Sequence, residues 1–411
     1  MKRSRQPTVN REPNNLSSYM NSTETVTHKA GWIIVDPYTI IRDGYIRVES
    51  GLIREIGRGS CSGHIIDHGP GALLPVLANA HTHLELCALK DKVKYENGFK
   101  SWVEKLIELR NSASPETLKT GAIKGLKELA ESGCGLIGEI STLGLTWETI
   151  SKSGLAGVWF REFLGNASPV DDTCDRKDFL VKSIAAHAPH TLAPNRIVEL
   201  KEITRKSNLP FSIHLAESED EIEFLQTGKG KWAEFLSERG IDFSGWNLPV
   251  ESPVKYLEDL GVLDENTMAV HLLHAEEKDF EILLRHNVRV CLCLRSNFNL
   301  HNMMPDLTGM LKAGIKPCLG TDSLASADSL SIFDEMAFAS KSFPSILPAE
   351  ILAMATVNGA NSLGFEDMCG SLTPGKRAAF VYAPVDVSSK SELLQAIVNA
   401  DFKEPCKTVL Q

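Results

Sequence analysis

The chain has 411 residues, of which 43% are hydrophobic and 23% are charged. These values are typical of soluble globular proteins and exclude a fibrous repeat or a chain that is disordered throughout. The formal net charge of −10 offers no basic surface for nucleic acid or for an anionic membrane. We therefore expect a folded protein whose partner is a small-molecule substrate.

The first 24 residues predict a disordered leader. They contain Lys2, Arg3 and Arg5 but no apolar run of the kind that a secretory signal needs. Whether Met1 or Met20 is the true start is left open. The nine cysteines form no C-x-x-C pair, which favours a reducing, cytoplasmic location. No apolar run approaches the ~20 residues that span a bilayer, so no membrane partner is expected.

Next in the chain, β-rich stretches alternate with turns from about residue 29, as in GWIIVD, YIRVESG and LIREIG. A second stretch of this type, GSLTPGKRAAFVYAP, lies near the other end. Alternation over short runs is typical of strands. We predict that residues 25–70 and 365–411 form one small β-sandwich domain built from both termini.

Between these ends, eight short apolar segments alternate with amphipathic stretches of helical spacing. Parallel strands buried on both faces have this apolar character, and eight of them with crossover helices form a (β/α)8 TIM barrel. We predict this α/β barrel over residues 71–364. Long insertions follow the first and fifth segments, carry Trp102, Trp232 and Trp246, and are candidate lids. The segments are ALLPVLANAHTH, GLIGEIS, LAGVWFREF, KSIAAHAPH, FSIHLAE, TMAVHLLHA, VRVCLCLRSN and KPCLGTDS.

Polar side chains gather at the ends of these predicted strands, where barrel enzymes place their active sites. His81 and His83 are two residues apart, so on a strand they share one face and can chelate an ion. By itself the pair also fits a solvated strand end. His214, His271 and Asp322 occupy other strand ends, and imidazole with carboxylate suits zinc or iron with a position open for water. Such an ion lowers the pKa of its bound water from 15.7 to about 7.

Glu217 lies three residues beyond His214, just past the predicted fifth strand. Loss of an amine from an aromatic ring requires protonation of a ring nitrogen and of the departing ammonia, which is work for a general acid/base. A glutamate in the first turn of a helix, favoured by the helix dipole, is the structural alternative. We favour the chemical role for Glu217.

The sequence resembles the metal-dependent amidohydrolases, in particular the cytosine-deaminase and chlorohydrolase-like branch that includes S-adenosylhomocysteine and aminofutalosine deaminases. The resemblance extends over nearly the whole chain. It departs from the usual pattern at Leu294, where relatives often have proline, and at His190, where many have tyrosine. The matching stretches are NAHTHLEL (79–86), HAPHT (187–191), HLAESEDE (214–221), VHLLHA (270–275), RSNFNL (295–300), GTDSLAS (320–326) and LTPGKRAAFV (372–381).

The resemblance implies a metal centre with one divalent ion. Zinc is the expected ion, and iron or manganese are the alternatives. Asp322 would also shuttle the proton taken from the nucleophilic water. No lysine lies in the predicted fourth strand, so a second, lysine-bridged ion has no candidate. The implied ligands are His81, His83, His214 and Asp322.

The remaining assignments concern catalysis and the substrate. The resemblance implies a catalytic His271, a general acid/base Glu217 and a His187 that contacts substrate. Ser296 and Asn297 match a pair near the active-site face, although capping the following helix explains them equally well. Trp102 and Arg295 complete the predicted substrate-binding set.

These residues together predict hydrolytic deamination of an aminated heteroaromatic ring by a metal-bound hydroxide, with release of ammonia. An adenine-type nucleoside derivative such as aminofutalosine or adenosylhomocysteine is the expected substrate. One alternative is a dechlorinase or other amidohydrolase that acts on a triazine or pyrimidine-like ring. An alternative of another class is a non-catalytic metal-binding barrel. Relatives are often dimers or larger, so a homo-oligomer is left open.

Overall fold

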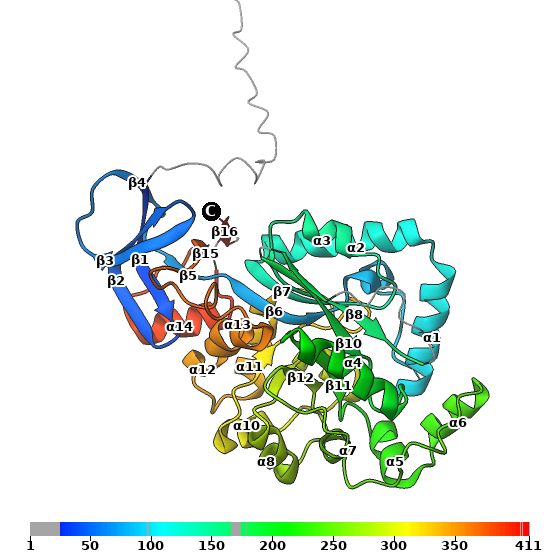
Figure 1. Ribbon diagram of the computed structural model, residues 1–411. Helices are drawn as coiled ribbons and strands as arrows, with labels where there is room; N and C mark the ends of the chain where they lie inside the picture. The colour runs from blue at the N-terminus through cyan, green and yellow to red at the C-terminus, as the bar shows by residue number, and fades with distance from the viewer. Residues whose placement is uncertain are drawn as a thin grey trace, which may run out of the picture.

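The computed structural model describes residues 25–96, 98–165, 174–177, 179–402, 404 and 406–410. The predicted leader, residues 1–24, lies outside the described residues. Figure 1 shows a barrel wrapped by helices and a smaller sheet beside it, in which strands from the two ends of the chain meet. The α/β class predicted from the sequence is confirmed.

Eight parallel strands form the barrel, and each overlaps one of the eight predicted segments. They follow one another around the sheet in chain order, and a parallel bridge between Thr82 and Asp322 joins the last strand's end to the first strand. A short strand, β9 (Asp175–Lys177), pairs antiparallel with β10. The barrel strands are β6 (Leu77–Thr82), β7 (Cys134–Ser141), β8 (Ala156–Phe163), β10 (Leu180–Ala186), β11 (Phe211–Leu215), β12 (Thr267–His271), β13 (Arg289–Leu292) and β14 (Cys318–Leu319).

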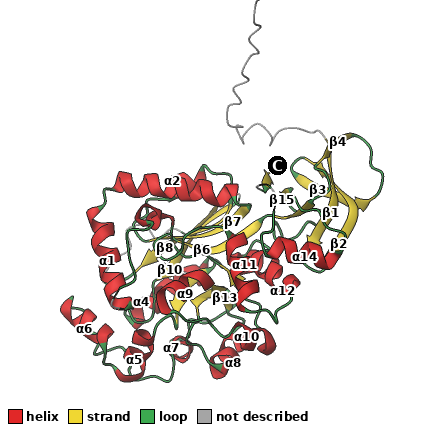
Figure 2. Ribbon diagram, turned by 180° about the vertical axis from the view of Figure 1, so that it is seen from behind, coloured by secondary structure: helices red, strands yellow, loops and turns green. Residues whose placement is uncertain are grey.

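Helices surround the barrel in both views (Figures 1 and 2). None of the described helices has the length and apolar character needed to cross a bilayer. The helices are η2 (Leu84–Leu89, a 3-10 helix), α1 (Phe99–Ser112), α2 (Pro115–Glu131), α3 (Trp147–Ser151), α4 (Pro194–Lys206), α5 (Glu219–Thr227), α6 (Lys231–Glu238), α7 (Pro253–Asp259), α8 (Glu277–Arg285), α9 (Leu294–His301), α10 (Leu307–Ala313), α11 (Ile332–Ser342), α12 (Pro348–Ala355), α13 (Val357–Leu363) and α14 (Lys390–Val398).

Local sequence signals begin several of these helices. The Ser114 side chain accepts a hydrogen bond from the backbone N–H of Thr117, and Pro115 occupies the first position of α2. Ser218 accepts from the N–H of Glu221 in the same way and begins α5. These caps satisfy N–H groups that the helix itself leaves without a partner. The cap at Ser218 fixes the backbone immediately after Glu217, where β11 gives way to α5.

The smaller part is one seven-stranded sheet made of β1 (Thr25–Asp36), β2 (Thr39–Glu49), β3 (Leu52–Arg58), β4 (His64–Asp67), β5 (Ala72–Pro75), β15 (Ala379–Ala383) and β16 (Lys407–Leu410). A β-bridge between Leu52, the first residue of β3, and Arg377 joins one edge of the sheet to the segment that precedes β15. The sheet therefore curls around its own core, which includes Ile33, Ile46 and Phe380. This arrangement matches the predicted small domain from both termini.

Two boundaries differ from the prediction. The first predicted segment, read as one barrel strand, is two strands, because β5 pairs with β1 and β15 in the terminal sheet while β6 pairs with β7 in the barrel. The terminal sheet therefore continues to Pro75, beyond the predicted limit at residue 70.

The two long insertions lie together at the mouth of the barrel. The first contains η2 and α1 after β6, and the second contains α5, α6 and α7 after β11. In Figure 1 both α1 and α6 lie on the side of the barrel that faces away from the terminal sheet. Side chains from α1 and α6 line the same cavity, so the candidate lids form its walls.

Candidate active site

Three imidazoles meet at the carboxyl end of the barrel strands. His81 lies in β6, His83 follows that strand, and His214 lies in β11. The Nε2 atoms of His81 and His214 are 3.2 Å apart, and each imidazole offers a nitrogen within 4.8 Å of the other two. The Oδ1 atom of Asp322, just after β14, lies 3.6 Å from Nε2 of His83 and 4.0 Å from Nε2 of His81. The structure thus brings the four predicted ligands together.

The surroundings of His81 and His214 keep these two imidazoles neutral. Burial and the neighbouring imidazoles lower the pKa of His81 well below its ordinary value. Burial, with His187 and His271 nearby, lowers the pKa of His214 to about 3. The Nδ1–H of His214 donates to the backbone oxygen of His187 over 2.7 Å, so the Nε2 atom of His214 carries a lone pair. Neutral imidazole is the form that binds metal ions.

Two hydroxyl groups orient the Asp322 carboxylate. Ser296 Oγ donates to Oδ2 of Asp322 over 2.6 Å and Ser326 Oγ donates to the same atom over 2.8 Å. The φ of Asp322 is +58°, a conformation that costs a non-glycine residue about 1–3 kcal/mol and is common at functional sites. The surroundings therefore hold Oδ1 towards the imidazoles.

Glu217 and His271 form a second pair beside the imidazoles. Oε1 of Glu217 lies 3.7 Å from Nε2 of His271 and 3.9 Å from Nε2 of His301. Nδ1 of His271 is 2.8 Å from Oδ1 of Asn297, a carbonyl that can only accept, so His271 donates there. Burial would raise the pKa of Glu217, but His271 and His301 outweigh burial and hold that pKa below its usual range. Glu217 is therefore held as a carboxylate beside the imidazole of His271.

A cavity of about 270 Å³ extends from these groups into the space between the two insertions. We call it the chamber. Its inner end contains His83, His214, His271 and Asp322. Its outer walls are mostly apolar and consist of Phe99, Trp102, Val103, Leu106 and Ile107 from α1, with Trp232, Phe235 and Leu236 from α6. An apolar cavity with a few convergent polar groups is the usual form of a small-molecule site.

A family model for the amidohydrolase family matches residues 72–409. The chain belongs to the amidohydrolase family. The match includes all the strands of the barrel and the segments that follow them. It also includes every residue that the sequence analysis assigned to the site.

Individual relatives of this amidohydrolase are also similar over most of its length. The 5-methylthioadenosine/S-adenosylhomocysteine deaminase of Pelotomaculum thermopropionicum is 28% identical, with 84% of this chain and 81% of that protein covered. The crystal structure of Helicobacter pylori aminofutalosine deaminase with methylthio-coformycin has a TM-score of 0.80 at 23% identity, covering 90% and 96% of the two chains. An adenosine deaminase from Xanthomonas campestris with bound zinc has a TM-score of 0.75 at 20% identity, covering 91% and 88%. These two structures support the fold.

The side chains at the inner end of the chamber in this amidohydrolase offer ligand atoms for a metal ion. Three imidazoles and a carboxylate are ligands that zinc accepts, and iron and manganese accept them as well. The lone pair on Nε2 of His214 points at Nε2 of His81 in a buried space. A cation between the imidazoles would satisfy that lone pair, so the residues present fit a divalent ion.

The predicted substrate contacts divide into two groups. His187 and Trp102 line the chamber. Burial, then the nearby His190, lowers the pKa of His187 to about 3, and its Nδ1 atom lies 2.9 Å from Oγ1 of Thr191. Trp102 is buried in α1 with its ring stacked 6.0 Å from that of Phe99. Both residues can therefore contact a bound molecule.

Arg295, Ser296 and Asn297, which were also predicted to bind substrate, are not among the residues that line the chamber. Nε of Arg295 donates to Oε1 of Glu335 over 2.8 Å, and its Nη1 donates to Asp328 over 2.6 Å. Its guanidinium is thus occupied by carboxylates outside the chamber. Ser296 and Asn297 contact Asp322 and His271 instead, so they orient site residues.

Sequence reasoning missed several charged or titratable residues of the site, among them Glu162 and His301. Glu162 ends β8 and lines the chamber with its side chain almost fully buried. His301 ends α9 and lies against Glu217. The signal for Glu162 was present, because it is an acidic residue near the end of an apolar strand. His301 gave no comparable signal in the sequence.

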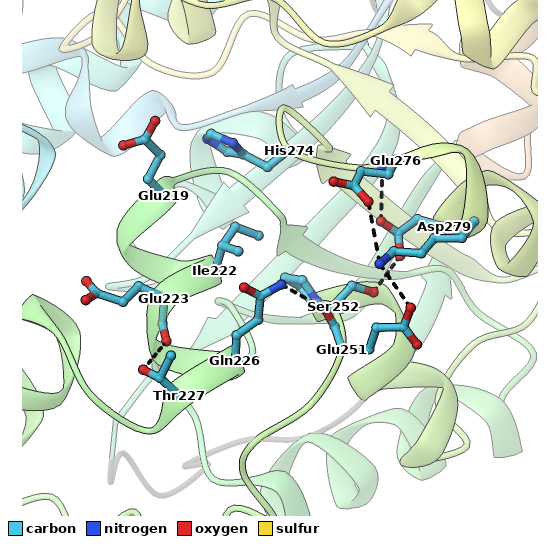
Figure 3. Close-up of a pocket in the computed structure, with 12 residues that line it drawn as sticks. Glu219, Ile222, Glu223, Gln226, Thr227, Glu251, Ser252, His274, Glu276 and Asp279 are labelled. Carbon is cyan, nitrogen blue, oxygen red and sulfur yellow. Dashed lines mark hydrogen bonds and ion pairs between the residues drawn. The ribbon is translucent and has the colours of Figure 1, made fainter.

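A second hollow lies outside the chamber, between α5 and the start of α8 (Figure 3). Several of its charged groups pair with one another. Lys278 Nζ lies 3.0 Å from Oε1 of Glu251 and 3.5 Å from Oε2 of Glu276. Asp279 accepts from the N–H of Glu276 at the start of α8. These contacts explain the charged residues they involve by structural roles and not by binding of a ligand.

Proposed function

We propose that this amidohydrolase is a metal-dependent hydrolytic deaminase that acts on an adenine-type nucleoside derivative. The observation that carries the proposal is the position of the Glu217–His271 pair directly beside the imidazoles and Asp322, at the inner end of an apolar chamber. An amine is a poor leaving group unless a proton is delivered to it. The pair supplies that proton exchange next to the ligand set.

The four ligand candidates would hold one divalent ion, with zinc as the proposed metal. A bound ion of this kind lowers the pKa of a coordinated water and so makes a nucleophile available at neutral pH. Asp322 would accept the proton of that water through Oδ1, the oxygen that Ser296 and Ser326 leave unoccupied. His81 lies in β6 and His214 in β11, two strands that are not neighbours in the barrel. Ligands on separate strands would fix where the water attacks a ring bound in the chamber.

The remaining steps use the chain's own groups. Glu217 would carry a proton to the ring nitrogen next to the reacting carbon, and His271 would hold the water on the correct side of the ring. The water supplies both protons of the step: one would reach the ring nitrogen through Glu217, and the other, accepted by Asp322, would pass to the amine so that it leaves as ammonia. The aromatic walls of α1 and α6 would exclude bulk water and pack against the ring and its substituent.

The names of the relatives support the substrate class. The Pelotomaculum protein is named for 5-methylthioadenosine and S-adenosylhomocysteine, and the Helicobacter structure for aminofutalosine. Each is an adenine nucleoside that carries a substituent on its sugar. The chamber offers space beyond its inner end for such a substituent.

The test is ammonia release by zinc-loaded protein with adenosine, methylthioadenosine, adenosylhomocysteine, aminofutalosine, guanine and a chlorotriazine. We expect ammonia from at least one adenine nucleoside. Glu217→Gln should reduce kcat by about 100-fold or more, a typical value for loss of an acid/base, while zinc content stays constant. Chloride release alone, or no release with any compound, would contradict the proposal.

A further inference from the structure

One face of α1 lines the chamber and ends in an arginine. Residues three and four positions apart share a helix face, and the lining residues of α1 follow this spacing. Five of them are apolar and the sixth is a cation. In chain order they are Phe99, Trp102, Val103, Leu106, Ile107 and Arg110. The apolar stripe therefore ends in a guanidinium.

The guanidinium of Arg110 has no partner in the part of the chain that the structure describes. No described carboxylate or carbonyl group forms an ion pair or a hydrogen bond with it. Its Nε atom is closed off by the protein, but the residue as a whole is half-buried and lines the chamber. Its two terminal nitrogens are therefore the accessible part. A charged group between protein walls is costly unless it is paired, so a bound anion would stabilise it.

Arg110 lies at the end of α1 that is remote from the reacting groups. At the other end, the ring of Phe99 lies 4.7 Å from that of His301, which contacts Glu217. Arg110 follows Phe99 by three turns of helix, about 16 Å at the rise of an α-helix. A nucleoside whose base reacts beside Glu217 could therefore reach Arg110 only with a substituent on its sugar.

The helix dipole offers a structural reason for a cation at this position. Arg110 is in the last turn of α1, where positive charge is favoured. The dipole does not depend on which face of the helix carries the cation. Arg110 is on the chamber face, and its charge adds to the burial that lowers the pKa of His187, another residue of the chamber wall. The direction of the side chain thus points to a partner inside the chamber.

The other charges of the chamber favour an anion beside Arg110 and disfavour a second cation. Arg239, at the end of α6, also lines the chamber, but its guanidinium packs over the ring of Phe235 at 3.5 Å and donates to the backbone oxygen of Phe235. An ammonium group near Arg110 would be repelled, whereas a carboxylate could accept from both terminal nitrogens. The described acidic residues of the lining all lie beside imidazoles of the inner end, and they are Glu162, Glu217 and Asp322.

We propose that the substrate carries on its sugar an apolar substituent that ends in a carboxylate without an ammonium group, and that Arg110 binds this carboxylate. This inference rests on the proposed function and narrows its substrate class. The apolar residues between Phe99 and Arg110 would pack against the substituent, and the guanidinium would fix its end. Adenosylhomocysteine, whose chain ends in a carboxylate and an ammonium group, would be a poorer substrate than the same nucleoside without the amino group.

The test uses three thioadenosines that differ only at the end of one chain. They are the 5′-S-(3-carboxypropyl) compound, its carboxamide, and adenosylhomocysteine, which adds an amino group to the first. With zinc-loaded protein we expect kcat/KM to be roughly 10- to 100-fold higher for the carboxylate than for the carboxamide, the range for a hydrogen bond to a charged group. The difference should lie mostly in KM, because the carboxylate is remote from the reacting carbon. Adenosylhomocysteine should be about tenfold below the carboxylate, since its ammonium group has no partner in the chamber.

Variants of α1 separate binding from a structural role. In Arg110→Met the preference for carboxylate over carboxamide should fall to a ratio near one, and Arg110→Lys, which keeps the charge, should retain part of it. Lys105→Met is the matched control, since it removes a cation of the same helix that pairs with Glu108 outside the chamber, and should keep the wild-type ratio. Zinc content and far-UV circular dichroism are measured for every variant. An equal loss with all three compounds in Arg110→Met, a wild-type ratio near one, or adenosylhomocysteine as good as the carboxylate would overturn the inference.

Failure of the proposed function gives a different result. If wild-type protein releases ammonia from none of the three compounds, deamination of these nucleosides is excluded. The same compounds are then titrated by calorimetry, and the ratio of affinities replaces the ratio of kcat/KM. Tighter binding of the carboxylate that depends on Arg110 would keep the inference, and equal or absent binding would overturn it.

Discussion

Several residues of the site never touch the chamber and act by holding those that do. Ser296 and Ser326 both donate to Oδ2 of Asp322. Asn297 accepts from His271. Such supporting contacts fix the direction of a ligand or a base, and their loss typically costs 10- to 100-fold in metal affinity or activity.

We expect Ser296→Ala to lower kcat/KM about tenfold, because Asp322 loses its shortest hydrogen bond and its Oδ1 atom is less well aimed. Zinc affinity should fall with activity, which a competition titration with a chelator would measure. Ser252→Ala is the control, because Ser252 is also buried but caps α7, away from the chamber. Wild-type activity in Ser296→Ala would contradict this role.

The sequence predicted the ligand residues because their chemistry depends on local spacing. His81 and His83 share a strand face, and His214 and Asp322 each end a predicted strand. The pairing of Arg295 with Glu335 could not be predicted, because the two residues are 40 positions apart in the chain and no spacing rule links them. Glu162 was missed for a similar reason, since the side chains around it come together only when neighbouring strands are in place.

At the scale of elements, α1 and α6 give the chamber its apolar walls, and Trp102 is the residue of α1 predicted from sequence to bind substrate. We expect Trp102→Leu to raise KM about tenfold with a smaller change in kcat, because it removes aromatic contact with the bound ring. Steady-state kinetics with the best nucleoside would measure both constants. Trp246→Phe, in the second insertion but not in the chamber wall, should leave KM unchanged. An equal change in both variants would point to a general loss of packing.

The cap at the start of helix α2 has a purely structural role. Ser114→Ala removes the side-chain acceptor at its N-terminus and should lower the free energy of unfolding by about 1 kcal/mol. Urea denaturation would measure this loss. Deaminase activity should stay at the wild-type value, since Ser114 is outside the chamber. A change in activity without a change in stability would contradict the assignment.

The barrel strands could be predicted because each of them is buried and therefore consists of a short apolar run. All eight barrel strands have such a run. The division between β5 and β6 was not recognised, because the apolar run continues through their junction, from Ala72 to Ala78. Pairing with β15, some 300 residues away in the chain, decides that β5 belongs to the other sheet.

For the molecule as a whole, removal of the metal should lower thermal stability. A ligand that binds only the folded state stabilises it by about 4 kcal/mol at a thousand times its dissociation constant. We expect a chelator to lower Tm and added zinc to restore it, as measured by calorimetric scans. His214→Ala should show little response to either addition. An unchanged Tm after elemental analysis has shown that zinc is gone would contradict a metal held by these four residues.

The bridge between Thr82 and Asp322 joins positions that are 240 residues apart in the chain. His81 and His83 lie on one side of this bridge and Asp322 on the other. The four ligand candidates therefore come together only when the last strand has paired with the first. Closing a segment of this length is entropically costly and slow compared with local folding. Binding of the ion by a refolding chain would therefore report closure of the barrel. Partly folded chains would bind zinc more weakly than the closed barrel does.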